Sequence, residues 1–386
     1  MSNRVCVVTG SRAEYGLLSP LLAALRADDA FQLQLLVTGS HLSPEFGLTY
    51  REIEADGYTI DEKVEVVLSS DTPVGICKSM GLGLISFSEA FSRLNPALIV
   101  VLGDRYEIFS AVSAAHISRI PVAHLHGGEV TEGAFDDALR HSITKMSHLH
   151  FTSTEAYRKR VIQLGEAPER VFNVGAIGLD NLQRLSLLSR EELEQDLGFK
   201  FNKYNLLCTF HPVTLEHNSS LEQVQSLLNV LEQQPDTNVI FTKTNADTDG
   251  RIINQLIDEF VEKNPDRYHA YVSLGQLRYL SMMQFADAVV GNSSSGIIEA
   301  PGFRIGTINI GNRQTGRIKS ELVIDCEPTK TGIASAFKTL YSSDFQKRRL
   351  QATNPYGEGQ TTSQIISILK ENFPGRTTQK SFYDLD

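Results

Sequence analysis

The sequence predicts an α/β protein made of two doubly wound domains, each built on a parallel sheet. Short runs such as residues 97–102 (ALIVVL) are too uniformly apolar to alternate, which is typical of strands covered on both faces. Amphipathic stretches separate these runs, and the alternation restarts after residue 180 without a repeat of sequence. We therefore expect a first domain at residues 1–180, a second at residues 181–360, and a helix and tail at residues 361–386 that pack back on the first domain.

Composition narrows the classes of function. The 386 residues carry a net charge of −10, which argues against nucleic acid or an anionic membrane as a partner. The four cysteines have no paired spacing, so we expect reduced thiols and neither a disulfide nor a zinc site. The first ten residues read as a strand instead of a charged leader, and no run approaches about 18 apolar residues. These features predict a cytoplasmic protein.

The first strand and helix offer a place for an anion. A strand at residues 4–8 is followed by the turn at residues 10–12 (GSR) and by a helix with leucines at helical spacing. The free amides of a helix start and the guanidinium of Arg12 suit a phosphate. A G-x-G-x-x-G sequence and a P-loop lysine are both missing here, so dinucleotide binding and ATP hydrolysis are not indicated. The next strand, residues 31–37, leads to His41; a structural role is the simpler interpretation of this histidine by itself, and it is also a candidate for substrate binding.

Two further elements lead to the centre of the first half. Residues 63–68 are rich in valine and partly charged, as expected of an edge strand. Residues 82–94 have helical spacing and lead through Asn95 and Pro96 into the apolar run at residues 97–102.

Polar residues follow two neighbouring apolar runs. Asp104 and Arg105 come after residues 97–102, and His124 and His126 come after the next run. Because ligands bind at the carboxyl ends of the strands in such sheets, we expect these side chains to line one crevice, with both imidazoles on the same side of their strand. Metal binding is the less favoured alternative, since no cysteine accompanies the histidines and the nearby acids equally suit proton transfer.

A helix after the second cluster carries Asp136 and Arg140 four residues apart. Such a spacing allows an ion pair on one helix face, and a surface pair of little energetic value is the simpler interpretation. Their position beside an apolar stripe and near a glycine loop favours the crevice instead.

In the second half of the chain, residues of the types that bind phosphate follow the predicted strands. Ser293 and Ser294 precede a helix expected to begin at residues 297–300, so small hydroxyl groups lie over free helix amides. Glu299, in the expected first turn, suits ribose hydroxyls. Strand ends also carry His211, Asn245 and Arg313. Phosphate is the simplest common ligand, and two such halves facing an interdomain cleft are typical of nucleotide-sugar enzymes.

Six ordered motifs spread over nearly the whole chain resemble one known family. They are residues 8–16 (VTGSRAEYG), 103–107 (GDRYE), 124–129 (HLHGGE), 140–145 (RHSITK), 211–212 (HP) and 291–296 (GNSSSG). Together they resemble the hydrolysing UDP-N-acetylglucosamine 2-epimerases of bacterial sialic acid synthesis. The resemblance implies a GT-B-like fold of two Rossmann-like domains, usually a homodimer, that converts UDP-N-acetylglucosamine and water into N-acetylmannosamine and UDP through 2-acetamidoglucal. It implies no cofactor and no metal.

The resemblance also implies roles for individual residues. It places the diphosphate against Arg12, Arg105, His211, Ser293, Ser294 and Arg313, the ribose against Glu299, and the nucleotide close to Asn245. The catalytic side matches Asp104, His124, Asp136 and Arg140, with Asp104 and Asp136 expected to move protons. His126 stands where non-hydrolysing relatives carry an acid, and imidazole is itself able to shuttle protons near neutrality.

Three alternatives remain open from the sequence. A close branch of the same family acts on a UDP-linked 2,4-diacetamido trideoxy sugar for legionaminic acid, and the phosphate motifs do not separate the two substrates. A GT-B glycosyltransferase shares the nucleotide site but does not need the cluster of Asp104, His126 and Asp136. A non-catalytic nucleotide-sugar sensor does not need that cluster either.

Overall fold

The computed structural model describes residues 3–68, 72–131, 135–212, 220–244, 250–372 and 379–385. The chain forms two compact units. The first contains Met1–Glu129, Phe135–Arg184 and Tyr356–Asp386, and the second contains Val130–Ala134 and Leu185–Pro355. Each unit is a doubly wound α/β domain with its own parallel sheet, as the sequence predicts.

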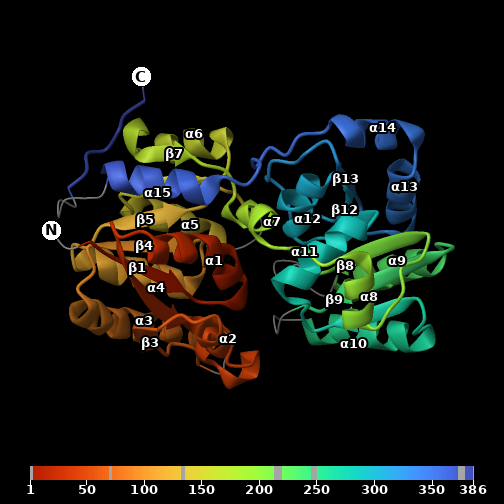
Figure 1. Cartoon of the computed structure of the whole chain (residues 1–386), viewed down its shortest axis with the longest axis horizontal. Helices are drawn as coiled ribbons and strands as arrows, with labels where there is room; N and C mark the ends of the chain where they lie inside the picture. Colours follow the sequence, from red (N-terminus) through yellow and green to blue (C-terminus); the bar gives the residue numbers. More distant parts are fainter. Residues whose placement is uncertain are drawn as a thin grey trace. The chain divides into compact units, whose positions relative to one another are not determined.

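The first unit has a seven-stranded sheet in the order β3-β2-β1-β4-β5-β6-β7, in which every pair of neighbours is parallel (Figure 1). Its strands are β1 (Arg4–Thr9), β2 (Gln32–Thr38), β3 (Glu62–Val64), β4 (Leu98–Leu102), β5 (Val122–Leu125), β6 (Leu149–Thr152) and β7 (Val171–Asn173). All five residues of β4 are buried, because helices cover both faces of the sheet.

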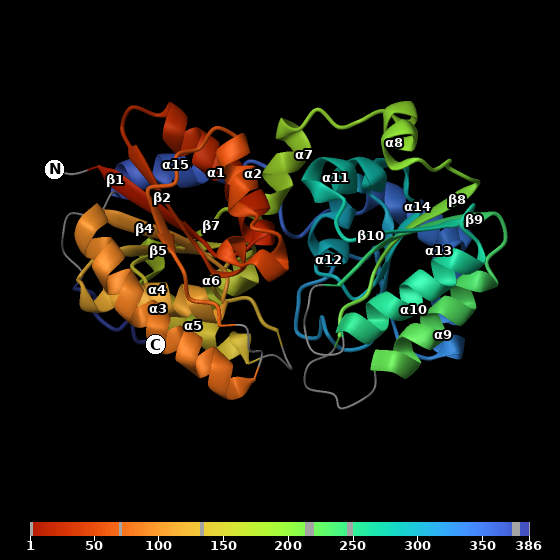
Figure 2. The ribbon, with the colours of Figure 1, turned by 90° about the horizontal axis from the view of Figure 1, so that it is seen from below.

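Helices cover the two faces of this sheet in two groups (Figure 2). They are α1 (Arg12–Ala27), α2 (Tyr50–Ala55), α3 (Pro73–Leu94), α4 (Tyr106–Ile117), α5 (Asp136–Met146), α6 (Glu155–Gln163), α7 (Asp180–Arg184) and α15 (Thr361–Asn372). Buried side chains of α1 and α15 form one core with alternate strand residues. Buried side chains of α3 and α4, with Ile143 of α5, form the core of the opposite face.

The last helix belongs to the first unit. Ile365 and Leu369 of α15 are fully buried in the core that α1 also lines. The carboxylate of Asp180 accepts hydrogen bonds from the backbone amides of Thr361 (2.9 Å) and Thr362 (2.5 Å), so it caps the start of α15. The contacts divide the chain after Arg184 and again after Pro355, where the sequence suggested residues 180 and 360.

The second unit has a six-stranded parallel sheet in the order β10-β9-β8-β11-β12-β13. Its strands are β8 (Tyr204–Thr209), β9 (Thr237–Thr242), β10 (Tyr268–Tyr271), β11 (Ala288–Gly291), β12 (Gly306–Ile310) and β13 (Val323–Cys326). Its helices are α8 (Arg190–Leu197), α9 (Ser220–Glu232), α10 (Gly250–Lys263), α11 (Gly275–Phe285), α12 (Ser295–Ile298), α13 (Lys330–Leu340) and α14 (Ser343–Gln351). Helices α9, α10 and α13 cover one face of this sheet (Figure 2). Their buried side chains form one core with alternate strand residues.

The structure bears on two expectations from composition, one about the cysteines and one about membrane-spanning helices. All four cysteines are free; Cys6 and Cys208 are buried in strands, and Cys77 is exposed on α3. Within the described ranges, α3 is the one helix long and apolar enough to cross a membrane by length and composition. Its inner face, which includes Phe87 and Phe91, is buried in the core of the first unit, as in a helix that covers a sheet.

Candidate active site

An ion pair joins the end of β4 to α5 in the first unit. Arg140 is 5% exposed, and its Nη2 contacts Oδ2 of Asp104, the second residue after β4. Its Nη1 donates to the backbone oxygen of Glu129 at 2.9 Å and to Oδ1 of Asp137 at 3.1 Å. The spacing of Asp136 and Arg140 allowed an ion pair between them, but the guanidinium instead bridges Asp104 and Asp137.

Asp136 is the first residue of α5 and has an unusual acidity. Burial raises the pKa of Asp136 to about 6, and the negative charge of Asp104 acts in the same direction. The positive charges of Arg105 and Arg140 oppose the shift without cancelling it. A carboxyl group that titrates near neutrality is suited to general acid or base catalysis.

His124 is fully buried, and both of its ring nitrogens have partners. Nε2 donates to the backbone oxygen of Gly103 at 2.8 Å, and Nδ1 lies 3.1 Å from the hydroxyl of Thr144 on α5. Burial lowers the pKa of His124 to about 3, so the ring is neutral at physiological pH. The bond from Nε2 fixes the backbone immediately before Asp104, and a catalytic role for His124 stays a prediction.

His126 does not continue the alternation of β5. The strand ends at Leu125, and His126 has a left-handed φ of 63°, so the expectation that both imidazoles share one side is wrong. Nε2 of His126 accepts a hydrogen bond from the backbone amide of Ile177 (3.2 Å), which leaves the proton on Nδ1, 3.1 Å from Oε1 of Glu129. Proton transfer by His126 requires one of these bonds to break.

The two arginines of the first unit that the resemblance assigns to the diphosphate have partly exposed side chains. Nε of Arg105 donates to Oε1 of buried Glu107 at 2.6 Å while its side chain remains 45% exposed. Nε of Arg12 lies 3.0 Å from Oε2 of Glu52, and its side chain is 41% exposed. Both arginines are accessible to a ligand.

His41 is not accessible to a ligand. Its side chain is fully buried, with Nε2 at 3.2 Å from the hydroxyl of Thr9 and Nδ1 at 2.8 Å from the hydroxyl of Thr49. Burial lowers the pKa of His41 to about 4, so it is a neutral structural histidine. This corrects its place among the substrate-binding candidates.

Two buried acids beside Arg105 were missed in the sequence. Oε2 of Glu14 accepts a hydrogen bond from the amide of Gly10 at 2.7 Å, and Glu107 is 1% exposed. Burial raises the pKa of Glu14, and the charge of Glu107 raises it further. A Cβ on Gly10 would lie 2.8 Å from Oε1 of Glu107, so glycine is required for this approach. The Ser-x-x-Glu spacing resembles an ordinary helix cap and gave no sign of this acid pair.

Asn292 organises three strand ends in the second unit. Its side chain is fully buried and bonds the backbone of His211 twice, accepting from the amide at 2.7 Å and donating to the carbonyl at 2.8 Å. The backbone oxygen of Asn292 accepts from Nη1 of Arg313 at 2.9 Å and from the side chain of Gln314 at 2.8 Å. A Cβ on the preceding Gly291 would lie 1.9 Å from the carbonyl oxygen of Thr209, so only glycine fits at the end of β11.

The imidazole of His211 is held from the neighbouring strand end. Its Nδ1 lies 3.0 Å from the hydroxyl of Thr244, which follows β9. Burial lowers the pKa of His211 to about 3, and the charge of Arg313 acts in the same direction, so the ring is neutral. Asn245, the next residue along the chain from Thr244, lies outside the described residues.

The helix that follows Ser293 and Ser294 begins earlier than the sequence predicted. Helix α12 begins at Ser295 and has four residues, so Glu299 caps its end instead of lying in its first turn. A 3₁₀ turn at Ala300–Phe303 follows, because Pro301 cannot continue the helix. The hydroxyl of Tyr279 on α11 contacts Oγ of Ser295, and burial raises the pKa of this tyrosine to about 12. Tyr279 adds a donor that the sequence did not reveal, since it lies on a separate helix.

The first unit presents acids at the strand ends of its sheet, and the second unit presents cations and hydroxyl groups at the strand ends of its own. Two doubly wound domains divided in this way are typical of GT-B-like enzymes of nucleotide sugars. The UDP-N-acetylglucosamine 2-epimerase family model matches residues 23–370, so the chain belongs to the UDP-N-acetylglucosamine 2-epimerase family.

Relatives in this family cover the chain from end to end. It is 42% identical to a GDP/UDP-N,N'-diacetylbacillosamine 2-epimerase (hydrolyzing) of Campylobacter jejuni, over 100% of both chains. It is 39% identical to the polysialic acid biosynthesis protein P7 of Escherichia coli, over 99% of this chain and 97% of that protein. The fold matches the crystal structure of the Neisseria meningitidis UDP-GlcNAc 2-epimerase bound to UDP-GlcNAc, with a TM-score of 0.82, 17% identity and coverage of 96% and 100%.

Proposed function

We propose that the chain is a hydrolysing 2-epimerase that releases UDP from a UDP-linked 2-acetamido hexose and yields the free sugar with inverted configuration at its second carbon. The observation that carries this proposal is the ion pair between Asp104 and buried Arg140 beside Asp136, a carboxyl group whose pKa is raised to about 6. A hydrolysing sugar-nucleotide epimerase needs such proton-transfer groups, whereas simple nucleotide binding does not.

The chemistry has two balanced steps. A carboxylate removes the proton from the second carbon, the electron pair forms a double bond to the first carbon, and the bond from that carbon to the UDP oxygen breaks. The product is a 2-acetamidoglycal. A carboxylate then takes a proton from water, the resulting hydroxide adds to the first carbon, and a protonated acid gives its proton to the opposite face of the second carbon. Asp136 is our first candidate for one of these transfers, and Asp104, held by Arg140, is our second.

Departure of UDP places negative charge on the diphosphate, which cations and hydrogen-bond donors stabilise. In the second unit Arg313, His211, Ser293 and Ser294 are our candidates for holding it, because Asn292 holds the guanidinium of Arg313 and the backbone of His211. Arg12 and Arg105 are the candidates in the first unit. We assign Glu299 to the ribose. No metal or nicotinamide is needed for these steps, and we expect a homodimer that acts in the cytoplasm.

Two sugars are candidates for the substrate. The motifs of the chain first suggested UDP-N-acetylglucosamine, which gives N-acetylmannosamine and UDP, the first step of sialic acid synthesis. The 42% identity to a diacetylbacillosamine 2-epimerase favours the second candidate, UDP-linked 2,4-diacetamido-trideoxyglucose, the substrate of the legionaminic acid branch.

The test is to incubate the purified protein with each sugar nucleotide in deuterated water and to follow the products by proton NMR. We expect free UDP and a free sugar that is epimerised and deuterated at the second carbon, with a higher kcat/KM for one of the two substrates. The Asp104→Asn variant serves as the matched inactive control. Binding without release of UDP from either substrate, or transfer only to an added acceptor sugar, would contradict the proposal.

A further inference from the structure

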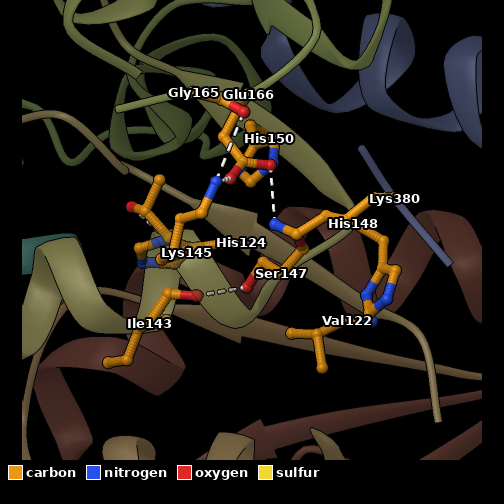
Figure 3. A network of polar contacts seen from close by, with 11 residues as sticks. Val122, His124, Ile143, Lys145, Ser147, His148, His150, Gly165, Glu166 and Lys380 are labelled. Atoms are coloured by element: carbon orange, nitrogen blue, oxygen red, sulfur yellow. Dashed lines mark hydrogen bonds and ion pairs between the residues drawn. The ribbon is translucent and has the colours of Figure 1, made fainter. Parts of the chain in front are cut away.

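A buried carboxylate joins residues 379–385, here called the C-terminal segment, to the elements that carry the candidate site. Glu166 lies between α6 and β7, and its side chain is 2% exposed. Figure 3 shows three basic side chains that converge on it from different parts of the chain. Oε1 accepts from Nζ of Lys145 at 2.8 Å, and Oε2 accepts from Nε2 of His150 at 3.0 Å and from Nζ of Lys380 at 2.7 Å.

The charge on Glu166 depends on these partners. Burial by itself raises the pKa of Glu166, but the contacts with His150, Lys145 and Lys380 outweigh it and hold that pKa at about 2. Glu166 is therefore ionised throughout the physiological range. Removing a charged partner from a buried carboxylate costs free energy, so the bound position of Lys380 beside Glu166 is favoured.

The C-terminal segment makes further contacts around this carboxylate. Nζ of Lys380 also donates to the backbone oxygen of Ser147 at 2.7 Å, and the amide of Tyr383 donates to the oxygen of Gly165 at 3.0 Å. The ring of Phe382 fills the space beside Gly165, where a Cβ would lie 2.4 Å from the ring. Nζ of Lys145 lies 4.5 Å from the centre of the same ring, which is a cation–π geometry.

Two short routes lead from Glu166 to the candidate active site. Lys145 is in the last turn of α5, the helix that begins with Asp136 and carries Arg140. His150 of β6 is in register with His124 of β5, whose Nε2 donates to the oxygen of Gly103 beside Asp104. Both routes end at the ion pair of Asp104 and Arg140.

We propose that Glu166 is a positioning residue for this ion pair, and that the C-terminal segment, through Lys380 and Phe382, is the latch that holds α5 in its active position. This inference rests on the proposed function, because the latch acts on the groups assigned to proton transfer. The segment itself contacts α5 and the loops next to it, and it does not take part in the chemistry.

The test compares Lys380→Met with Lys370→Met in the full chain. Lys370 also lies near the C-terminus, but its ion pair with Asp28 (2.7 Å) fastens α15 instead of α5. Below the melting temperature of both variants, we expect Lys380→Met to lower kcat about tenfold while KM and the UDP dissociation constant change less than twofold. We expect the acid limb of its kcat profile to move to lower pH, because Asp136 loses burial. Lys370→Met should behave as the wild type in all four measurements.

Two further variants and one measurement without substrate complete the design. Lys380→Arg keeps a charged donor and should restore most of kcat. Phe382→Ala removes a contact of the C-terminal segment but leaves the ion pair of Lys380 with Glu166. It should lower kcat and move the acid limb to lower pH, as Lys380→Met does. Hydrogen exchange should show faster exchange of the α5 amides in Lys380→Met but not in Lys370→Met.

The outcomes separate this inference from the proposed function. A wild-type protein that releases no UDP from either sugar nucleotide refutes the function, and the exchange rates of α5 still test the latch. Unchanged kcat, an unchanged acid limb or unchanged α5 exchange in Lys380→Met would each overturn the latch, even where the melting temperature falls.

Discussion

Nη1 of Arg313 donates a hydrogen bond to the backbone oxygen of Asn292 over 2.9 Å, and this bond fixes a guanidinium beside the end of β11. The side chain of Asn292 simultaneously holds the backbone of His211. A cation fixed in this way is ready for an anion before the anion arrives, which reduces the entropy lost on binding.

Replacing Arg313 with alanine should weaken UDP binding. We expect the dissociation constant for UDP, measured by calorimetry, to rise about 10- to 100-fold, since a charge-assisted contact contributes about 1.5–3 kcal/mol. Lys338 is exposed on α13, and Lys338→Ala also removes one positive charge from the second unit. This control should leave the affinity for UDP unchanged. An unaltered dissociation constant in Arg313→Ala would reject the phosphate assignment.

Asp104→Asn should stop turnover without affecting the nucleotide. The amide removes a carboxylate from the reaction and from Arg140, while Asp137 still pairs with that arginine at 3.1 Å. We expect kcat to fall at least about 1,000-fold, and the affinity for UDP to stay within twofold. Asp258→Asn, which breaks an ion pair with Lys243 in the second unit, is the control for a lost aspartate. Turnover at the wild-type rate would remove Asp104 from the chemistry.

The pH dependence of kcat should report Asp136. If the ionised carboxylate acts as the base, kcat falls about tenfold for each pH unit below a pKa of about 6. The residual activity of Asp136→Asn should lack this limb. A profile that is flat from pH 5 to pH 8 in the wild type, once stability has been verified over that range, would be incompatible with the role.

Glu14→Gln should stabilise the protein increasingly as pH rises. The unfolded carboxyl ionises above its ordinary pKa of 4.5, but burial and the charge of Glu107 keep the folded group protonated to higher pH. The unfolded state therefore binds fewer protons in this window, and ionisation favours unfolding. We expect the melting temperature of Glu14→Gln to exceed that of the wild type by several degrees at pH 8 and to match it near pH 4.5. Glu52→Gln alters an exposed acid of the same unit and should show no such trend.

Sequence pattern predicted the parts of the fold that depend on burial. Continuous apolar runs such as the one at β4 identify strands covered on both faces, and leucine spacing identifies α1, because each pattern follows from the geometry of one element. The strand-end positions of Asp104 and His211 followed from the same reasoning.

Other features depend on contacts between distant segments, which periodicity does not encode. His126 adopts a positive φ, so the alternation of β5 ends one residue earlier than the sequence suggested. Arg140 bonds across to Asp104 because a long side chain is able to leave its own helix face. Glu166 and Lys380 are far apart in sequence, and nothing in either local pattern indicates that they meet.

The placement of α15 has a consequence for biosynthesis. The first unit draws its core from both ends of the chain, since Ile365 and Leu369 are buried with side chains of α1. During translation, this unit is therefore unable to complete its core until α15 has been synthesised and has left the ribosome. The second unit, whose strands all lie within residues 204–326, emerges whole before then, so the order of folding on the ribosome should run opposite to the order of synthesis.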